Sequence, residues 1–157
     1  MNDVTIYTDG GALGNPGPGA YGVVLLCSGH RKELSGGFNC TTNNRMELLA
    51  CITALEALKR PCRVTLHSDS KYVVDGIEKG WADRWRANGW KRNKKDQAIN
   101  PDLWGRLLDL CDKHQVTFRW VKGHAGTPEN ERCDQLVQAK AHESNLPDDE
   151  NYLKSQE

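Results

Sequence analysis

Residues 63–79 read RVTLHSDSKYVVDGIEK, and this stretch joins a predicted strand to a predicted helix. Residues 63–69 are typical of a short strand, because apolar side chains alternate with polar ones. The helix covers residues 71 to about 79, and its inward face is formed by Tyr72, Val73, Gly76 and Ile77. A strand that runs straight into a helix indicates the start of an alternating α/β passage.

The chain before this stretch predicts three strands and a long helix. We expect antiparallel strands at residues 4–9, 20–27 and 31–39. The loop GALGNPGPG at residues 11–19 separates the first two strands, since its glycines and prolines disfavour regular structure. From Thr42 the apolar period becomes 3.6, which predicts a helix. Its buried stripe consists of Leu48, Cys51, Ile52, Leu55 and Leu58.

The chain after this stretch continues the alternation of helices and strands. Asn100 followed by Pro101 opens a helix that reaches Cys111, because proline favours the first helical position. Residues 116–121 predict a strand, and a last helix runs from Thr127 to about residue 142. Residues 144–157 have no period, so we expect a flexible acidic tail there.

These elements together predict an α/β fold built on a five-stranded mixed sheet. Its first three strands are expected to be antiparallel and the helix-connected strands parallel, with the helices packed on the sheet. A chain of 157 residues is long enough for one domain and too short for two. We therefore expect a single domain at residues 1–143, followed by the tail at residues 144–157.

The composition predicts a cytoplasmic protein without a membrane anchor. Its apolar runs are short, whereas a membrane span needs about 20 apolar residues. The first residues also lack the basic and apolar segments of a signal peptide. The six cysteines are widely spaced and no two form a CxxC pair, so we expect reduced thiols that pack in the core.

Charge is distributed unevenly along the chain, although the formal net charge is zero. Residues 79–95 read KGWADRWRANGWKRNKK and carry seven positive charges against one aspartate. Trp81, Trp85 and Trp90 alternate with these basic residues. Indole rings beside cations suit stacking on nucleobases next to phosphate contacts, which favours a nucleic-acid surface. The alternative is a solvated helix that its tryptophans anchor to the domain.

Four acidic residues occupy positions where the predicted fold favours burial. Asp9 and Asp69 each end a strand, whereas Glu47 and Asp134 lie on the apolar sides of two helices. Buried carboxylates repel one another unless protons or cations neutralise them. Mg²⁺ prefers carboxylate oxygens, and two such ions form a clamp for in-line attack on a phosphodiester. Each acid alone fits a helix cap or a surface position better, so a metal site requires that the fold bring them together.

Several segments resemble bacterial ribonuclease HI in that family's order, from about Val4 to His142. They are YTDGGALGNPGPGAYGVVL, TTNNRMELLACITALEALK, SDSKYV, WVKGHAGTPENERCD and the tryptophan-rich basic stretch. The resemblance implies the ribonuclease H-like fold, with the basic stretch as a protrusion that binds the substrate. It also implies an endonuclease that hydrolyses the RNA strand of RNA/DNA hybrids and leaves 3′-hydroxyl and 5′-phosphate ends.

The resemblance assigns a catalytic role to five residues. Asp9, Glu47, Asp69 and Asp134 match the family's metal-binding carboxylates, which implies Mg²⁺, with Mn²⁺ as a substitute and two ions once substrate is bound. His124 matches the family's catalytic histidine, which is proposed to assist proton transfer or product departure, and an imidazole near its neutral pKa suits either role.

The resemblance also implies substrate contacts. Asn15, Asn43 and Lys71 match positions that contact the minor groove of the hybrid, although Lys71 stands where a glutamine is usual. Thr42 matches a residue that holds a phosphate of the DNA strand. Cys40 replaces the arginine that usually accompanies it, and we hypothesise that Arg84 supplies the missing charge.

The protrusion implied by the resemblance adds further expected substrate contacts. These are Trp81, Trp85, Trp90 and Lys91, in addition to Arg84. The expected partner is an RNA/DNA hybrid, and we expect a stand-alone monomer with no membrane partner.

Three other functions were weighed against the nuclease. The first is a non-catalytic module that binds RNA/DNA hybrids with the same fold. An aspartyl-phosphate phosphatase would use Asp9 as nucleophile, but the second aspartate typical of such enzymes is replaced here by Gly11. A nucleotide-binding loop is disfavoured, because the glycine-rich loop lacks the Gly-Lys-Ser/Thr ending.

Overall fold

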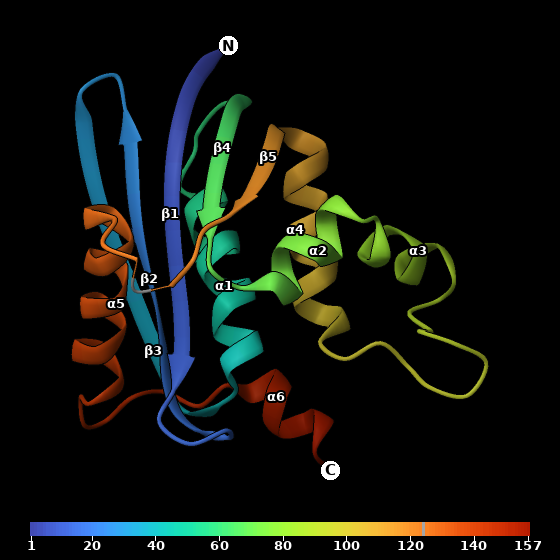
Figure 1. Cartoon of the computed structure of the whole chain (residues 1–157). Helices are drawn as coiled ribbons and strands as arrows, with labels where there is room; N and C mark the ends of the chain where they lie inside the picture. The colour runs from blue at the N-terminus through green and yellow to red at the C-terminus, as the bar shows by residue number, and fades with distance from the viewer. Residues whose placement is uncertain (124) are drawn as a thin grey trace.

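A five-stranded sheet forms the centre of the fold in a computed structural model that describes residues 1–123 and 125–157 (Figure 1). The strands are β1 (Asn2–Ala12), β2 (Gly17–Cys27), β3 (His30–Thr41), β4 (Cys62–Ser68) and β5 (Gln115–Trp120). The helices are α1 (Asn43–Glu56), α2 (Lys71–Glu78), α3 (Trp81–Ala87), α4 (Pro101–Lys113), α5 (Pro128–Ala141) and α6 (Glu150–Ser155).

The sheet is mixed, with the strand order β3-β2-β1-β4-β5. The pairs β1–β2 and β2–β3 are antiparallel, whereas β1–β4 and β4–β5 are parallel. This topology confirms the predicted α/β fold. The first two strands are longer than predicted, because their ladder continues to the pairing of Ala12 with Gly19. The turn between them is correspondingly short.

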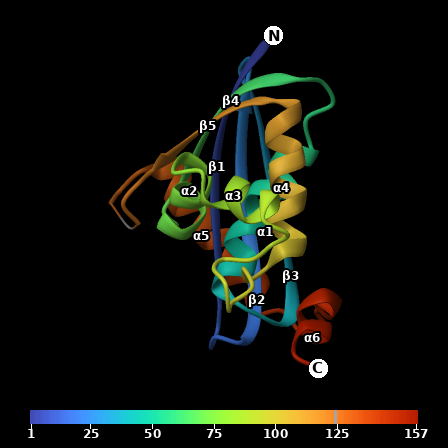
Figure 2. The same cartoon turned by 90° about the vertical axis from the view of Figure 1, so that its right-hand side faces the viewer.

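Helices cover both faces of the sheet. On one face α1 packs against β1 and β2 and also contacts α4, and on the other face α5 packs against β1, β2 and β3 (Figures 1 and 2). The main core lies under α1, α2 and α4, where Trp104 is the largest fully buried side chain. The predicted stripe of α1 is confirmed for Leu48, Cys51, Ile52 and Leu55, which are fully buried, and Leu58 packs at its edge.

The cysteines are free thiols and three of them are buried: Cys51, Cys62 and Cys133. Burial raises the pKa of the Cys133 thiol to about 12, so this group stays protonated and packs like a small apolar side chain. No helix in the described part of the chain is long and apolar enough to cross a membrane.

The C-terminal segment differs from the expectation of an irregular tail, because residues 150–155 form α6. Asp149 precedes this helix and is only 6% exposed. Its Oδ2 accepts hydrogen bonds from Arg45 Nε at 2.8 Å and from Thr41 Oγ1 at 2.7 Å. The backbone N–H of Asn39 donates to the Pro147 oxygen at 2.7 Å. The segment is therefore attached to β3 and to the start of α1.

The basic stretch leaves the body of the domain. Figure 1 shows α3 and the loop that follows it extending sideways from the sheet. The base of this protrusion is fixed by Trp85, whose ring meets the buried Trp104 ring edge-on at 5.8 Å between centroids. Trp90 is also partly buried against the core. These two tryptophans therefore anchor the protrusion, as the alternative interpretation of this stretch expected.

Candidate active site

Asp9 and Asp69 lie on neighbouring parallel strands. Thr8 of β1 pairs with Ser68 of β4, so the two aspartates occupy the next position along each chain. Asp69 directly follows β4, where the backbone turns into α2. The parallel pairing of β1 with β4 thus places both aspartates at one level of the sheet.

Glu47 reaches this level from the fifth position of α1. A Cβ built on Gly10 would collide with backbone atoms of Met46 and Glu47, so the missing side chain lets α1 rest directly on β1. Thr42 starts the helix, and its Oγ1 accepts a hydrogen bond from the Arg45 N–H at 3.2 Å. The side chain of Glu47 is 7% exposed.

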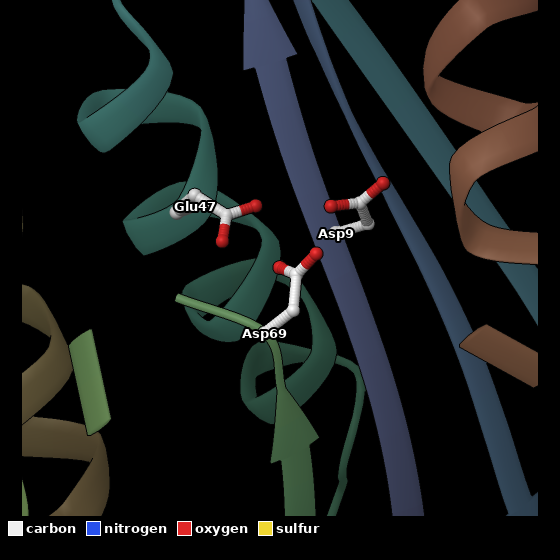
Figure 3. A group of neighbouring side chains, drawn as sticks. All are labelled: Asp9, Glu47 and Asp69. Carbon is white, nitrogen blue, oxygen red and sulfur yellow. The ribbon is translucent and has the colours of Figure 1, made fainter. Parts of the chain in front are cut away.

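The three carboxylates converge in the space between β1, α1 and the end of β4 (Figure 3). One oxygen from each of Asp9, Glu47 and Asp69 lies within 4.8 Å of the other two. The geometry thus meets, for these three acids, the condition that the sequence set for a metal site. Their role as metal ligands stays a prediction.

Burial and mutual repulsion raise the pKa values of Asp9 and Glu47. Burial, followed by the charges of Asp69 and Asp134, raises the pKa of Asp9 to about 7. Burial, followed by the charges of Asp9 and Asp69, raises the pKa of Glu47 well above its ordinary value. Such perturbed carboxyl groups are concentrated at functional sites.

The cluster fits hard divalent cations. Within the described residues, Glu47 Oε1 is buried and has no hydrogen-bond partner, so an acceptor remains available inside the cluster. Three carboxylates contribute only oxygen ligands, which suits Mg²⁺ better than a softer metal. A cation would also remove the repulsion that raises the pKa values of Asp9 and Glu47.

Asp134, the fourth acid predicted to be catalytic, is not a member of this group of three. Asp134 lies on α5 and is partly buried, and it is near enough for its charge to raise the pKa of Asp9. Its oxygens are not within the 4.8 Å that groups the other three acids. The predicted role of Asp134 as a fourth ligand therefore stays a prediction. His124 lies outside the described residues.

Two asparagines cross-link the β1–β2 turn to α1. Asn43 Oδ1 accepts a hydrogen bond from the Ala12 N–H at 2.6 Å, and Asn15 Oδ1 accepts one from the Asn43 N–H at 3.0 Å. The Asn15–Pro16 peptide bond is cis. Both amide oxygens are thus held by backbone groups, and the two side-chain NH₂ groups remain as donors.

Thr42 and Arg84, which the sequence analysis joined in one phosphate pocket, line different hollows. Thr42 borders a cavity of about 490 Å³. Asn100 lines the same cavity, which the sequence analysis did not predict. Arg84 borders a hollow of about 440 Å³ in the protrusion, and its Nη1 donates to the Lys79 oxygen at 3.1 Å. The hypothesis that Arg84 replaces the charge missing at Cys40 stays a prediction.

The hollow in the protrusion is lined by basic side chains and by the Trp85 indole. Its lining consists of Arg84, Trp85, Asn88, Lys91 and Arg92. The ammonium of Lys79 lies 5.5 Å from the centroid of the Trp81 ring. These residues offer positive charge and aromatic surface, as the sequence predicted for Trp81, Trp85 and Lys91.

Trp120 is a neighbour of the cluster that the sequence did not single out. Its indole N–H donates to the backbone oxygen of Asp69 at 3.1 Å. Its ring lies 4.8 Å from the ammonium nitrogen of Lys71. Trp120 is the last residue of β5, and the alternation of residues along that strand does not show which group its indole N–H would reach.

Comparisons with known proteins agree with this fold and cluster. A family model described as RNase H matches residues 1–142. A ribonuclease H of Desulforamulus reducens is 67% identical over 147 residues, which cover 94% of this chain and 92% of that protein. A ribonuclease HI of Synechocystis sp. is 57% identical over 150 residues, which cover 94% of each chain.

Solved structures of RNase H1 proteins are also similar to this chain. LC9-RNase H1 is 35% identical with a TM-score of 0.80, and the match covers 90% of this chain and 72% of that one. The crystal structure of LC11-RNase H1 in complex with an RNA/DNA hybrid is 26% identical with a TM-score of 0.68, covering 88% of this chain and 96% of that one.

A mixed sheet with carboxylates converging from β1, α1 and β4 defines the ribonuclease H-like class of proteins. Within that class, the chain belongs to the RNase H family. The resemblance to bacterial ribonuclease HI seen in the sequence is thereby confirmed.

Proposed function

We propose that this protein hydrolyses the RNA strand of RNA/DNA hybrids and leaves 3′-hydroxyl and 5′-phosphate ends. The convergence of Asp9, Glu47 and Asp69 within 4.8 Å carries the proposal, because such a cluster suits the hydrolysis of a phosphodiester. Membership of the RNase H family and the likeness to LC11-RNase H1, solved in complex with an RNA/DNA hybrid, support this substrate.

Asp9, Glu47 and Asp69 would hold two Mg²⁺ ions, with Asp134 as the fourth ligand, and Mn²⁺ would substitute for Mg²⁺. Bound ions of this kind supply an activated water and neutralise the charge that develops on the leaving 3′ oxygen. The protein contributes the fixed spacing of the carboxylates and the burial of Glu47. His124 is proposed to assist proton transfer or product departure.

Asn15 and Asn43 would read the minor groove of the hybrid. Their amide oxygens accept hydrogen bonds from the backbone, so their NH₂ groups face substrate as donors. Donors match the acceptors of the minor groove and the 2′-oxygen of RNA, which is the atom that separates RNA from DNA. The fixed amides would therefore contribute to recognition of the RNA strand.

Thr42 and the protrusion would hold the DNA strand. The cations and indoles of the protrusion suit phosphate and stacking contacts, and Thr42 and Asn100 offer polar groups at a cavity near α1. This division assigns hydrolysis to the sheet and most of the electrostatic affinity to the protrusion.

We also propose that the protein acts as a monomer in the cytoplasm. Its free thiols fit a reducing compartment. Sedimentation equilibrium of the purified protein tests the oligomeric state, and a stable dimer at micromolar concentration would contradict it.

Cleavage of an end-labelled RNA/DNA hybrid tests the proposed function. We expect metal-dependent cleavage of the RNA strand alone, with no cleavage of single-stranded RNA, duplex RNA or duplex DNA. Asp9→Asn should bind the hybrid and leave it uncut. Binding without product at any Mg²⁺ or Mn²⁺ concentration would instead favour the non-catalytic hybrid-binding module.

A further inference from the structure

Trp120 contacts two functional residues with two different parts of one side chain. The end of β5 pairs Trp120 with Ser68, which places the indole beside Asp69. The indole N–H donates to the Asp69 oxygen at 3.1 Å, and the ring lies 4.8 Å from the Lys71 ammonium. The side chain remains 46% exposed, so one side of the ring faces solvent at the edge of the cluster.

We propose that Trp120 is a positioning residue with two separable tasks. Its N–H fixes the backbone of Asp69, which directs the Asp69 carboxylate toward Asp9 and Glu47. Its ring holds the Lys71 ammonium where this cation contacts a phosphate of the RNA strand, in place of the minor-groove contact that the resemblance implies for this position. The inference rests on the proposed function, because it assigns the Lys71 contact to the strand that is cut.

The first task follows from the place of Asp69 in the chain. The parallel ladder of β4 and β5 ends with the pair Ser68–Trp120, so the Asp69 carbonyl lies beyond it. The Val121 N–H donates to the Ser68 oxygen at 2.9 Å, and the next carbonyl along β4 receives the indole N–H. The Trp120 side chain thus continues the hydrogen bonding of the strand by one residue, at the residue that carries the carboxylate.

The loop after β5 comes close to the same carboxylate. A Cβ built on Gly123 would lie 2.8 Å from Asp69 Oδ2, so the loop passes over this oxygen without a side chain. The Asp69 carboxylate therefore has little room to move toward Gly123. The Trp120 hydrogen bond fixes the Asp69 backbone in an orientation that keeps its carboxylate clear of Gly123.

The second task follows from the position of Lys71. Lys71 is the first residue of α2, where the helix dipole disfavours a cation. The Trp120 ring face offsets this, since a cation within about 6 Å of an indole centroid is attracted to it. The ammonium is consequently held two residues from Asp69 rather than free in solvent.

A cation at this place meets a specific requirement of the substrate. The phosphate that is cut must approach Asp9, Glu47 and Asp69, and the phosphates next to it belong to the same RNA strand. A nearby ammonium lowers the electrostatic repulsion between this strand and the acids. The exposed face of the Lys71–Trp120 pair is therefore suited to an RNA-strand phosphate.

The first task is tested by calorimetric titration of Mn²⁺ into the protein without nucleic acid. Trp120→Phe keeps a ring and removes the N–H, and we expect it to weaken Mn²⁺ binding by roughly tenfold, as loss of a group that orients a ligand does. Lys71→Gln should not weaken Mn²⁺ binding, because it removes a positive charge near the cations. Unchanged Mn²⁺ affinity in Trp120→Phe would overturn the first task.

The second task is tested by hybrid affinity in the Asp9→Asn background, measured over a range of salt concentration. Lys71→Gln should weaken binding several-fold and lower the salt slope by about 1, the effect of one phosphate contact. Trp120→Leu should do the same, whereas Trp120→Phe should stay near the parent value. Lys113→Gln, an exposed lysine of α4 near the opposite end of β5, is the matched control and should change neither.

The double variant Lys71→Gln/Trp120→Leu separates positioning from general damage. If Trp120 acts on the phosphate through Lys71, the double variant binds the hybrid like Lys71→Gln alone. Additive losses would overturn the second task, and thermal unfolding of each variant shows whether the fold is kept. Absence of cleavage by the parent protein, together with the expected affinities, would overturn the proposed function and leave these contacts standing.

Discussion

Arg45 and Glu47 are two residues apart near the start of α1, and their buried charges have opposite surroundings. Arg45 is 3% exposed and donates to Asp102 Oδ2 and to Asp149 Oδ2, each at 2.8 Å. Glu47 is 7% exposed, and its nearest charged neighbours are two further acids. The Arg45 charge is neutralised by carboxylates of the protein, whereas the Glu47 carboxylate faces other carboxylates.

The difference separates a structural site from a site built for a ligand. A buried charge with hydrogen-bonded partners of opposite sign holds elements together, and here Arg45 joins α1, α4 and the segment before α6. A buried charge that faces like charges destabilises the fold until a cation arrives. Substitutions at the two places should therefore act in opposite directions.

The largest expected effect is loss of cleavage at the acidic site. Glu47→Gln should lower kcat by about 10³-fold, since metal-bound charge stabilisation is worth several kcal/mol and each 1.36 kcal/mol is a factor of ten. The same substitution should leave the unfolding free energy unchanged or higher in the absence of metal, because one repelling charge is removed. Single-turnover cleavage and urea denaturation measure the two quantities. Glu56→Gln, an exposed position on the same helix, is the control.

The converse effect is expected at Arg45. Arg45→Met should lower the unfolding free energy by about 3 kcal/mol, because Asp149 would be left buried without its cation. Urea denaturation measures this loss. Arg106→Met, which removes only an exposed ion pair with Glu56, should cost less than about 1 kcal/mol. Equal losses in the two variants would contradict the contrast drawn above.

A smaller effect is expected from pH. The pKa of Asp9 is raised from 3.8 to about 7 in the folded protein, so the folded state keeps its proton over a range where the unfolded chain loses it. The unfolding free energy without metal should therefore fall by at most about 1.4 kcal/mol for each pH unit as pH rises through this window. Asp9→Asn should flatten the dependence, and Mg²⁺ should stabilise the protein more at pH 8 than at pH 5. Stability that rises over this window in metal-free buffer and is unaffected by Asp9→Asn would contradict the assignment.

The smallest effect is expected from a single neutral partner of the Arg45 network. Thr41→Val keeps the shape of the side chain and removes the donor to Asp149 Oδ2. The unfolding free energy should fall by about 1 kcal/mol, since Arg45 still satisfies the carboxylate. Differential scanning calorimetry resolves a change of this size, and a loss as large as that of Arg45→Met would show that Thr41 is not a secondary partner.

The acidic site could be predicted largely from local patterns. Asp9 and Asp69 interrupt apolar strands at their ends, and Glu47 lies on the apolar side of a periodic helix. Each of these signals is contained in about ten residues of sequence. The parallel pairing of β1 with β4 then brings the two aspartates to one level, and this pairing was not part of the sequence prediction, because two strands and a helix separate β1 from β4 in the chain.

The Arg45 network could not be predicted in this way. Arg45 and Asp149 are separated by 104 positions, and neither residue interrupts a pattern around it. Asp149 belongs to a run of acids that suits a solvated tail equally well, which is why α6 was not expected. The Trp120–Asp69 contact was missed for the same reason, because a side-chain donor that reaches a distant carbonyl leaves no trace in composition or period.

The contact of α1 with β1 at Gly10 fixes the distance between the two backbones that carry Glu47 and Asp9. Because the helix backbone already touches the strand, it cannot move closer to compensate for a shorter side chain. Exchanging Glu47 for aspartate would remove one methylene from its reach, and the gap would remain open. The site therefore tolerates little change in the length of the Glu47 side chain, because the absence of a Cβ at Gly10 already lets the two backbones touch.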